Sequence, residues 1–321
     1  MSDLTRRGFI SRSTTASLAL GAGFSLATSV GAADKKSESA KANPTICAFT
    51  KSFQDRPIPE VCRMFKQIGL DGLDLTVRPK GHIEPENVKA ELPKAAAAAK
   101  QAGVEIVQLT TGIVEADRNA ENMLAVCREI GVKKIKLGYF RYKEFGSLAN
   151  QLDETRRTIA TIAKLAGKYG VLPCLHVHSG TFLPSHGTQA YQLVKDFSPT
   201  EVGAYVDMLH MVLEGGRDGW RQGLDLLGPW ISLCAVKNFI FEQGERDRHG
   251  QLRWHSRLVP VSEGVSPIPD FVAALKKLDY KGPYSLHSEY KGRHSFKDMT
   301  TDECLQQTKT DLDFFKPLVQ A

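Results

Sequence analysis

The feature that most constrains this fold is a glycine that recurs where predicted helices end. Five times, an apolar or small residue ends a predicted helix, a glycine follows, and a new strand-like segment begins. Glycine suits this position because it readily adopts the left-handed backbone conformation that stops a helix. The intervals between these glycines are 28 to 39 residues, except for a last interval of 58 residues that can hold two units: Gly69, Gly103, Gly131, Gly170 and Gly228. A repeat of about 30 residues is the length of one strand plus one helix.

Short apolar runs predict eight strands, at residues 46–50, 72–77, 104–109, 134–137, 171–178, 202–208, 231–239 and 283–289. Helices are predicted to follow them near residues 59–68, 93–102, 120–130, 152–169, 188–197, 220–227, 268–278 and 301–315. Eight alternating pairs favour a single α/β domain, a closed (β/α)8 TIM barrel over residues 44–321. An open doubly wound sheet is the alternative. No Gly-x-Gly-x-x-Gly sequence follows the first strand, which argues against a dinucleotide-binding fold.

Residues 1–33 are predicted to be a twin-arginine signal peptide. The segment Thr5-Arg6-Arg7-Gly8-Phe9-Ile10 precedes a charge-free run at 16–30 and a small-residue end at 31–33. A disordered basic terminus is the alternative, and residues 34–43 resemble a polar linker. We therefore expect a protein that the twin-arginine translocation machinery exports in folded form. It is expected to be periplasmic or secreted, without a stable membrane anchor.

The charges and cysteines argue against other classes of partner. The 42 Lys and Arg residues exceed the 36 Asp and Glu residues by only six in 321, which is not the pattern of a nucleic-acid-binding protein. The six cysteines form no pair at metal-site spacing. Cys174 and Cys234 lie in apolar runs that are typical of a core.

Ionisable residues collect where the predicted strands end, which is where TIM barrels carry their active sites. In chain order they are Arg78, His82, His176, His178, Asp207, His210, Lys237, His287 and Glu289. Each has a structural alternative, since a histidine can be a hydrogen-bonded core residue and Asp207 can cap a helix. Burial of such groups from four strands would be costly without a shared ligand or metal, so a common polar site is predicted.

Imidazoles and carboxylates without thiolates suit Zn²⁺, Mn²⁺ or a similar divalent ion. Such an ion beside a lysine suits chemistry next to a carbonyl group. The ion would polarise a ketone, a carboxylate or imidazole would remove the neighbouring proton, and the ion or Lys237 would stabilise the enediolate.

Five motifs carry a resemblance to one family. They are Gly72 to Pro79 with Gly81-His82, Leu137 to Tyr142, His178 to Thr181, Asp207 with His210 and Glu214 to Gly216, and Gly282 to Tyr290. Over residues 43–319 the chain resembles the xylose-isomerase-like TIM-barrel superfamily of sugar phosphate isomerases and epimerases. More narrowly, it is similar to an exported branch found in planctomycetes and related bacteria.

The resemblance implies a divalent-metal site, which in the superfamily uses a strand-five Glu, a strand-six Asp, a strand-seven His and a strand-eight Glu. Asp207 and Glu289 match two of these ligands, and His176 stands where the strand-five Glu is expected. Ala235 replaces the strand-seven His. The predicted cofactor is Mn²⁺, Zn²⁺ or Mg²⁺ on His176, Asp207 and Glu289, with a further histidine completing the set. The alternative is a metal-free site in which Lys237 supplies the positive charge.

The resemblance also implies a sugar isomerase or epimerase that acts through an enediolate. The predicted catalytic residues are Lys237, His178, His210 and Glu289, and the predicted substrate-binding residues are Arg78, His82, His287 and Glu263. Glu263 belongs to segment 241–267, a predicted loop or hairpin that either covers the barrel mouth or is a surface insertion. Because sugar phosphates are mainly cytoplasmic, export favours an unphosphorylated sugar, keto-sugar or polyol. A homo-oligomer is compatible with the sequence.

Three other functions stay open. A keto-sugar or 3-keto-glycoside lyase would use the same site, since His176-Val177-His178-Ser179-Gly180-Thr181 is similar to a motif of inosose dehydratases. A metal-dependent hydrolase needs a richer ligand set, against which Ala235 argues. A carbohydrate-binding barrel without catalysis is the third.

Overall fold

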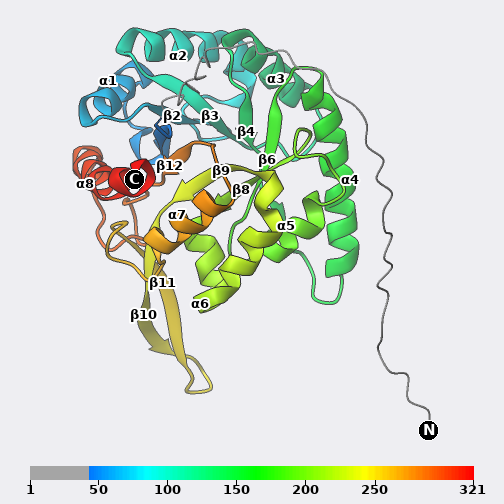
Figure 1. Ribbon diagram of the computed structural model, residues 1–321, viewed down its shortest axis with the longest axis vertical. Coiled ribbons are helices and arrows are strands. Elements are labelled where there is room, and N and C mark those ends of the chain that lie inside the picture. Colours follow the sequence, from blue (N-terminus) through cyan, green and yellow to red (C-terminus); the bar gives the residue numbers. More distant parts are fainter. Residues whose placement is uncertain (1–42) are drawn as a thin grey trace, which may run out of the picture. The chain divides into compact units, whose positions relative to one another are not determined.

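Eight parallel strands close into a barrel in the computed structural model, which describes residues 43–321 (Figure 1). They are β1 (Ile46–Phe49), β2 (Gly72–Val77), β3 (Glu105–Thr111), β4 (Lys134–Lys136), β6 (Leu172–His176), β8 (Gly203–Asp207), β9 (Ile231–Val236) and β12 (Tyr284–Leu286). The β1 strand is hydrogen-bonded to both β2 and β12, which closes the sheet. The predicted TIM barrel is confirmed and the open sheet is wrong. The predicted signal peptide and residues 34–42 of the predicted linker lie outside the described residues.

Within the described residues, eight α-helices surround the barrel (Figure 1). They are α1 (Ile58–Ile68), α2 (Val88–Ala102), α3 (Arg118–Ile130), α4 (Leu148–Gly167), α5 (Gly187–Val194), α6 (Met208–Leu227), α7 (Ile268–Lys277) and α8 (Thr301–Gln320). Each buries one apolar face; in α1 this face includes Val61, Phe65 and Ile68, which share one side of the helix. Three short 3₁₀ turns, η1 (Thr50–Phe53), η2 (Pro85–Asn87) and η3 (Gly228–Trp230), complete the connections.

The recurring glycines end the first three helices as predicted. Gly69, Gly103 and Gly131 directly follow α1, α2 and α3, and their φ angles are 91°, 73° and 85°. The expectation is wrong for Gly228, whose φ is −34°. The chain there tightens into η3 before β9, so 3₁₀ bonding rather than a left-handed residue ends the helix.

Three element boundaries differ from prediction in ways that shape the mouth of the barrel, defined as the end where the strands terminate. His178 and Glu289 are not in strands: the His178 N–H donates to Pro184 O, and the Glu289 N–H donates to His287 O. The α6 helix begins at Met208 rather than near residue 220, because the Asp207 carboxylate caps it. The side chains of His178 and Glu289 therefore lie on the turns that follow β6 and β12.

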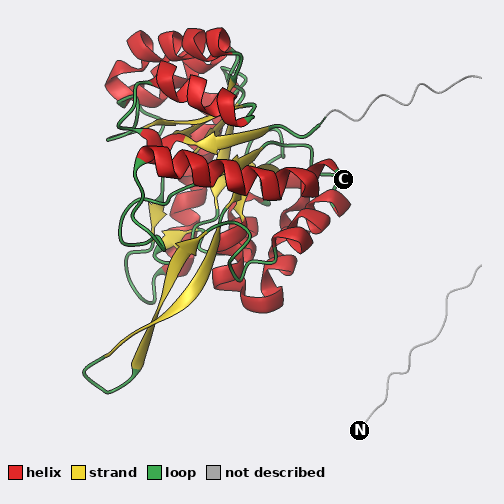
Figure 2. Cartoon of the chain, turned by 90° about the vertical axis from the view of Figure 1, so that its left-hand side faces the viewer, coloured by secondary structure: helices red, strands yellow, loops and turns green. Residues whose placement is uncertain are grey.

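The segment after β9 forms an antiparallel hairpin of β10 (Asn238–Arg246) and β11 (Leu252–Val259). Figures 1 and 2 show that it projects away from the barrel. Its base is tied down by the buried Asn238 side chain, which donates to Val261 O and Ser266 O and accepts from the Ser266 N–H. A second small sheet pairs β5 (Phe140–Arg141) with β7 (Phe182–Leu183).

All six cysteines are buried free thiols. None of the helices formed by residues 43–321 is long and apolar enough to cross a membrane.

The close approach of β2 and β3 generates a stability prediction. A Cβ atom on Gly72 would collide with the carbonyl oxygen of Glu105 and lie 2.6 Å from Val107 Cγ2. Gly72→Ala should therefore lower the free energy of unfolding by about 1–3 kcal/mol, measured by urea denaturation. Gly167→Ala is the control, because an added Cβ there meets no described atom within 4 Å. Equal stability of the two variants would contradict this account of the sheet.

Candidate active site

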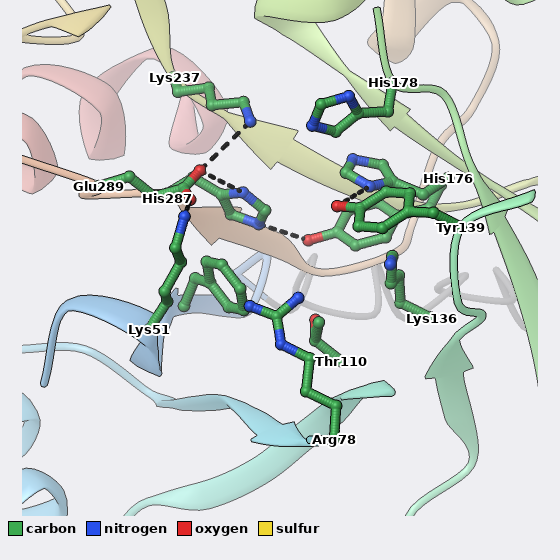
Figure 3. Close-up of a pocket in the computed structure, with 12 residues that line it drawn as sticks. Lys51, Arg78, Thr110, Lys136, Tyr139, His176, His178, Lys237, His287 and Glu289 are labelled. Carbon is green, nitrogen blue, oxygen red and sulfur yellow. Dashed lines mark hydrogen bonds and ion pairs between the residues drawn. The ribbon is translucent and has the colours of Figure 1, made fainter. Parts of the chain in front are cut away.

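The mouth of the barrel contains a cavity of about 150 Å³ (Figure 3). Its lining comes from strand ends and from the turns that follow them: Phe49, Lys51, Arg78, Thr110, Lys136, Tyr139, His176, His178, Tyr205, Lys237, His287 and Glu289. This volume is smaller than the sites of drug-sized ligands, which are about 300–1,000 Å³. The cavity therefore suits a molecule smaller than a typical drug. Six of the predicted site residues line this cavity: Arg78, His176, His178, Lys237, His287 and Glu289.

Lys237 lies between two carboxylates at one side of the cavity. Its Nζ is 3.2 Å from Asp207 Oδ2 and 3.4 Å from Glu289 Oε2, and the side chain is almost fully buried. Burial alone would lower the pKa of Lys237, but Asp207 and Glu289 raise it above its ordinary value. Burial would likewise raise the pKa of both carboxyls, yet their cationic neighbours hold both pKa values well below the usual range. The three groups form a charged triad.

Asp207 is a helix cap and a member of this triad at once. Its Oδ1 accepts from the backbone N–H groups of Leu209 and His210, each at 3.0 Å. Its Oδ2 faces His176 Nε2 at 3.3 Å as well as Lys237. His210 lies behind the cavity wall, where its Nδ1 is 2.7 Å from Ser179 Oγ. The start of α6 thereby fixes the position of the site carboxylate.

His178 is a neutral imidazole at the edge of the cavity. Its Nδ1 donates to the carbonyl oxygen of Ser179 at 3.1 Å, which leaves the Nε2 lone pair free. Burial and the nearby Lys237 charge lower its pKa to about 4. Its ring packs against His210 with a centroid separation of 3.8 Å and an interplanar angle of 35°.

His287 has the opposite electrostatic setting. Its Nε2 is 2.9 Å from Tyr205 Oη and 3.6 Å from Asp74 Oδ2, while its Nδ1 is 3.8 Å from Glu289 Oε2. Burial would lower the pKa of His287, but its contacts with Asp74 and Glu289 raise it above the ordinary value. One wall of the cavity therefore offers a base and another an acid.

Two predicted substrate-binding residues are not brought to this cavity. The His82 ring lies within hydrogen-bond distance of Thr50 Oγ1, Thr76 Oγ1 and Phe53 O, so it ties the turn after β2 to η1. Glu263 is exposed in the turn after β11. Segment 241–267 contributes no residue to the cavity lining, which favours the surface insertion over the lid as its role. Local hydrogen bonding and the outward course of the hairpin explain these differences.

Sequence reasoning missed several residues of the lining, above all Lys136 and Tyr139. Lys136 ends β4, and its Nζ lies 3.3 Å from the centroid of the Tyr139 ring. Lys51 follows β1 and pairs with Glu289. A lysine at the carboxyl end of a short apolar strand is the signal that could have pointed to Lys136.

The predicted divalent-ion site is not assembled by these residues. Among residues 43–321, no group of three or more His, Cys, Asp or Glu side chains is placed to hold a metal ion. The Lys237 ammonium lies against both carboxylates, the other Asp207 oxygen accepts from the α6 backbone, and the other Glu289 oxygen pairs with Lys51. Ala235 provides no ligand. The predicted set His176, Asp207 and Glu289 is therefore corrected: a divalent ion does not fit because a lysine neutralises the carboxylates.

Comparisons with known proteins place this geometry in a family. A comparison with curated proteins gives no match. Among solved structures, the 3-keto-D-glucoside 4-epimerase of E. coli has 15% sequence identity and a TM-score of 0.62 over 85% of this chain and 99% of its own. The probable 3-DHS dehydratase of Bacillus anthracis has 15% identity and a TM-score of 0.60 over 84% of this chain and 98% of its own.

A third structure, from Mycobacterium smegmatis, is a xylose isomerase-like TIM barrel protein in complex with magnesium. It has 13% identity and a TM-score of 0.59 over 87% of this chain and 98% of its own. Identities this low establish a common fold only. The family described as a xylose isomerase-like TIM barrel matches residues 62–318, and the chain thus belongs to the xylose isomerase-like TIM-barrel family.

Proposed function

We propose that this protein is an isomerase or epimerase that removes the proton next to the carbonyl group of a keto-sugar and forms an enediolate. The observation that carries the proposal is the pairing of a fixed ammonium, Lys237, with a neutral imidazole, His178, at the same cavity. Both side chains point into the space between them (Figure 3). An enolisation needs a base for the proton and a positive charge for the oxygen.

Lys237 supplies the positive charge in this proposal. An ammonium has three donors, of which Asp207 and Glu289 engage two, so one remains for a substrate oxygen. The carboxylates hold this ammonium in place before the substrate arrives. A positioned charge of this kind stabilises an oxyanion more effectively than a mobile one, because it needs no reorganisation during the reaction.

His178 supplies the base. Its Nδ1–H is held by Ser179 O, so Nε2 is free to accept the proton. The lowered pKa keeps the ring neutral at physiological pH. His287 lines another wall of the cavity and its raised pKa favours the protonated ring, so this residue can return a proton to the other face of the enediolate. Proton return at the same carbon gives an epimer, and proton return at the neighbouring carbon gives an isomer.

A lyase is the second candidate, and His287 favours it. The raised pKa of His287 favours the protonated ring, and a protonated ring in the cavity lining can protonate a departing hydroxyl group. Loss of a β-hydroxyl from the enediolate would complete a dehydration. The structural similarity to a probable dehydratase is in keeping with this alternative.

The proposed substrate is an unphosphorylated sugar, and the predicted signal peptide supports this part of the proposal. A periplasmic or secreted enzyme would meet few sugar phosphates. A 3-keto-glycoside is the specific candidate suggested by the similarity to the 3-keto-D-glucoside 4-epimerase.

Deuterium exchange tests the proposed function. In D₂O, the protein should incorporate deuterium next to the carbonyl of at least one of D-fructose, D-tagatose and a 3-keto-glucoside, measured by mass spectrometry. His178→Ala should slow this exchange by about 10²–10⁴-fold because the base is lost. His255→Ala, in the exposed hairpin, is the control and should exchange normally. Binding of the sugars without any exchange would leave a non-catalytic carbohydrate-binding barrel.

The charged triad generates a second prediction. Exchange should be unaffected by EDTA, and elemental analysis of the purified protein should find no stoichiometric divalent ion. Lys237→Gln should lower the exchange rate by about 10²-fold or more because the oxyanion loses its partner.

Loss of this lysine leaves the buried Asp207 carboxylate without its ammonium partner and Glu289 with Lys51 alone, which costs about 3–5 kcal/mol. Circular dichroism must therefore confirm that the variant is folded, and Lys237→Arg, which keeps the charge, should retain more activity than Lys237→Gln. A rate that disappears with EDTA and returns with Mn²⁺ would refute the metal-free mechanism.

A further inference from the structure

The cavity holds two basic side chains that have no carboxylate partner within 4 Å among the described residues. Lys51 and Lys237 are paired with the triad carboxylates, whereas Lys136 and Arg78 form no ion pair in residues 43–321. The two unpaired residues lie on either side of Thr110, away from Lys237 (Figure 3). The cavity therefore has a paired side and an unpaired side.

Lys136 is the more unusual of the two. Its side chain is 1% exposed, and within the described part of the chain Nζ has no hydrogen-bond partner. Burial and the Arg78 charge lower the pKa of Lys136 well below its ordinary value. The Tyr139 ring covers the amine on one side. A buried amine without an acceptor is costly, and an anion delivered by a ligand would satisfy it.

Arg78 presents a guanidinium whose side chain forms no hydrogen bond within residues 43–321. Its Cζ lies 5.5 Å from the centroid of the Phe49 ring, so one face is packed while the N–H edges remain available. A guanidinium edge binds carboxylate or phosphate oxygens in a bidentate manner.

The charge of Asp74 acts on Lys136, but within the described residues Asp74 forms no ion pair with Lys136 or Arg78. It accepts hydrogen bonds from Gln108, Thr110, Tyr205 and Ser285 beneath the cavity. Its remaining ionic neighbour is His287 at 3.6 Å. These four hydrogen-bond donors therefore stabilise the Asp74 carboxylate.

We propose that Lys136 and Arg78 bind an anionic group of the substrate, a carboxylate or a phosphate, so that the enzyme acts on an acidic sugar. The substrate then extends from this anion-binding side to the reacting carbonyl between Lys237 and His178. The reaction in this inference rests on the proposed function, whereas binding of the anion does not depend on it. Because the predicted export makes a sugar phosphate an unsuitable substrate, we assign the anionic group to the carboxylate of a sugar acid.

Isothermal titration calorimetry tests the anion site with matched ligands: D-fructose, its 6-carboxylate analogue D-fructuronate, and D-fructose 6-phosphate. At least one acidic sugar should bind 10-fold or more tightly than D-fructose. Lys136→Met and Arg78→Gln should each remove at least 10-fold of the affinity for that acid and change D-fructose binding less than twofold. Arg141→Gln, which removes an exposed charge beside Phe182 outside the cavity lining, is the control and should bind normally.

Tighter binding of the uronate assigns the site to a carboxylate, and tighter binding of the phosphate ester assigns it to a phosphate. Equal affinity for neutral and acidic sugars, or equal loss of both in the variants, would overturn the anion site. Acid-selective binding without deuterium exchange would instead refute the proposed reaction while the anion site stands.

Discussion

The ammonium of Lys237 between Asp207 and Glu289 is the interaction on which the rest of the site depends. The buried Asp207 carboxylate and the largely buried Glu289 carboxylate each require a cation or a proton. Here the cation is part of the polypeptide, so it arrives with the fold and links the ends of β8, β9 and β12. Asp207 extends the linkage to the first turn of α6 through its two backbone hydrogen bonds. The same contacts therefore balance the charges on this side of the cavity and fix the geometry of the barrel mouth.

Barrel closure then divides the cavity into two electrostatic halves. On the β8, β9 and β12 side, each charge has a partner, and the preorganised triad suits the stabilisation of a transient oxyanion. On the β2 and β4 side, Arg78 and Lys136 have no ionic partner among the described residues. A preorganised half suits chemistry, and an unsatisfied half suits recognition, because binding energy comes from groups that gain partners only in the complex.

The fold was predictable because its signals are local and repeated: helix, glycine, strand, at a nearly constant interval. Prediction failed at the strand ends, where His178 and Glu289 continue an alternating pattern although their backbones already bond within turns. The metal ligands were inferred from position along each strand. Asp207 and Glu289 do lie close to one common group, but that group is the Lys237 ammonium. Position along a strand does not show that a long lysine side chain lies between two carboxylates. Lys136 was missed because a lysine near a strand end ordinarily extends into solvent.

The amino-acid sequence by itself determined the number and order of the barrel strands and helices, the family, and the end of the barrel at which ionisable residues gather. These properties follow from hydrophobic periodicity and from residues read one segment at a time. Only the tertiary structure decided which charges neutralise each other and which remain without partners. The physical reason is that ion pairing and desolvation depend on distances of a few ångströms between side chains from different strands, and barrel closure alone sets those distances.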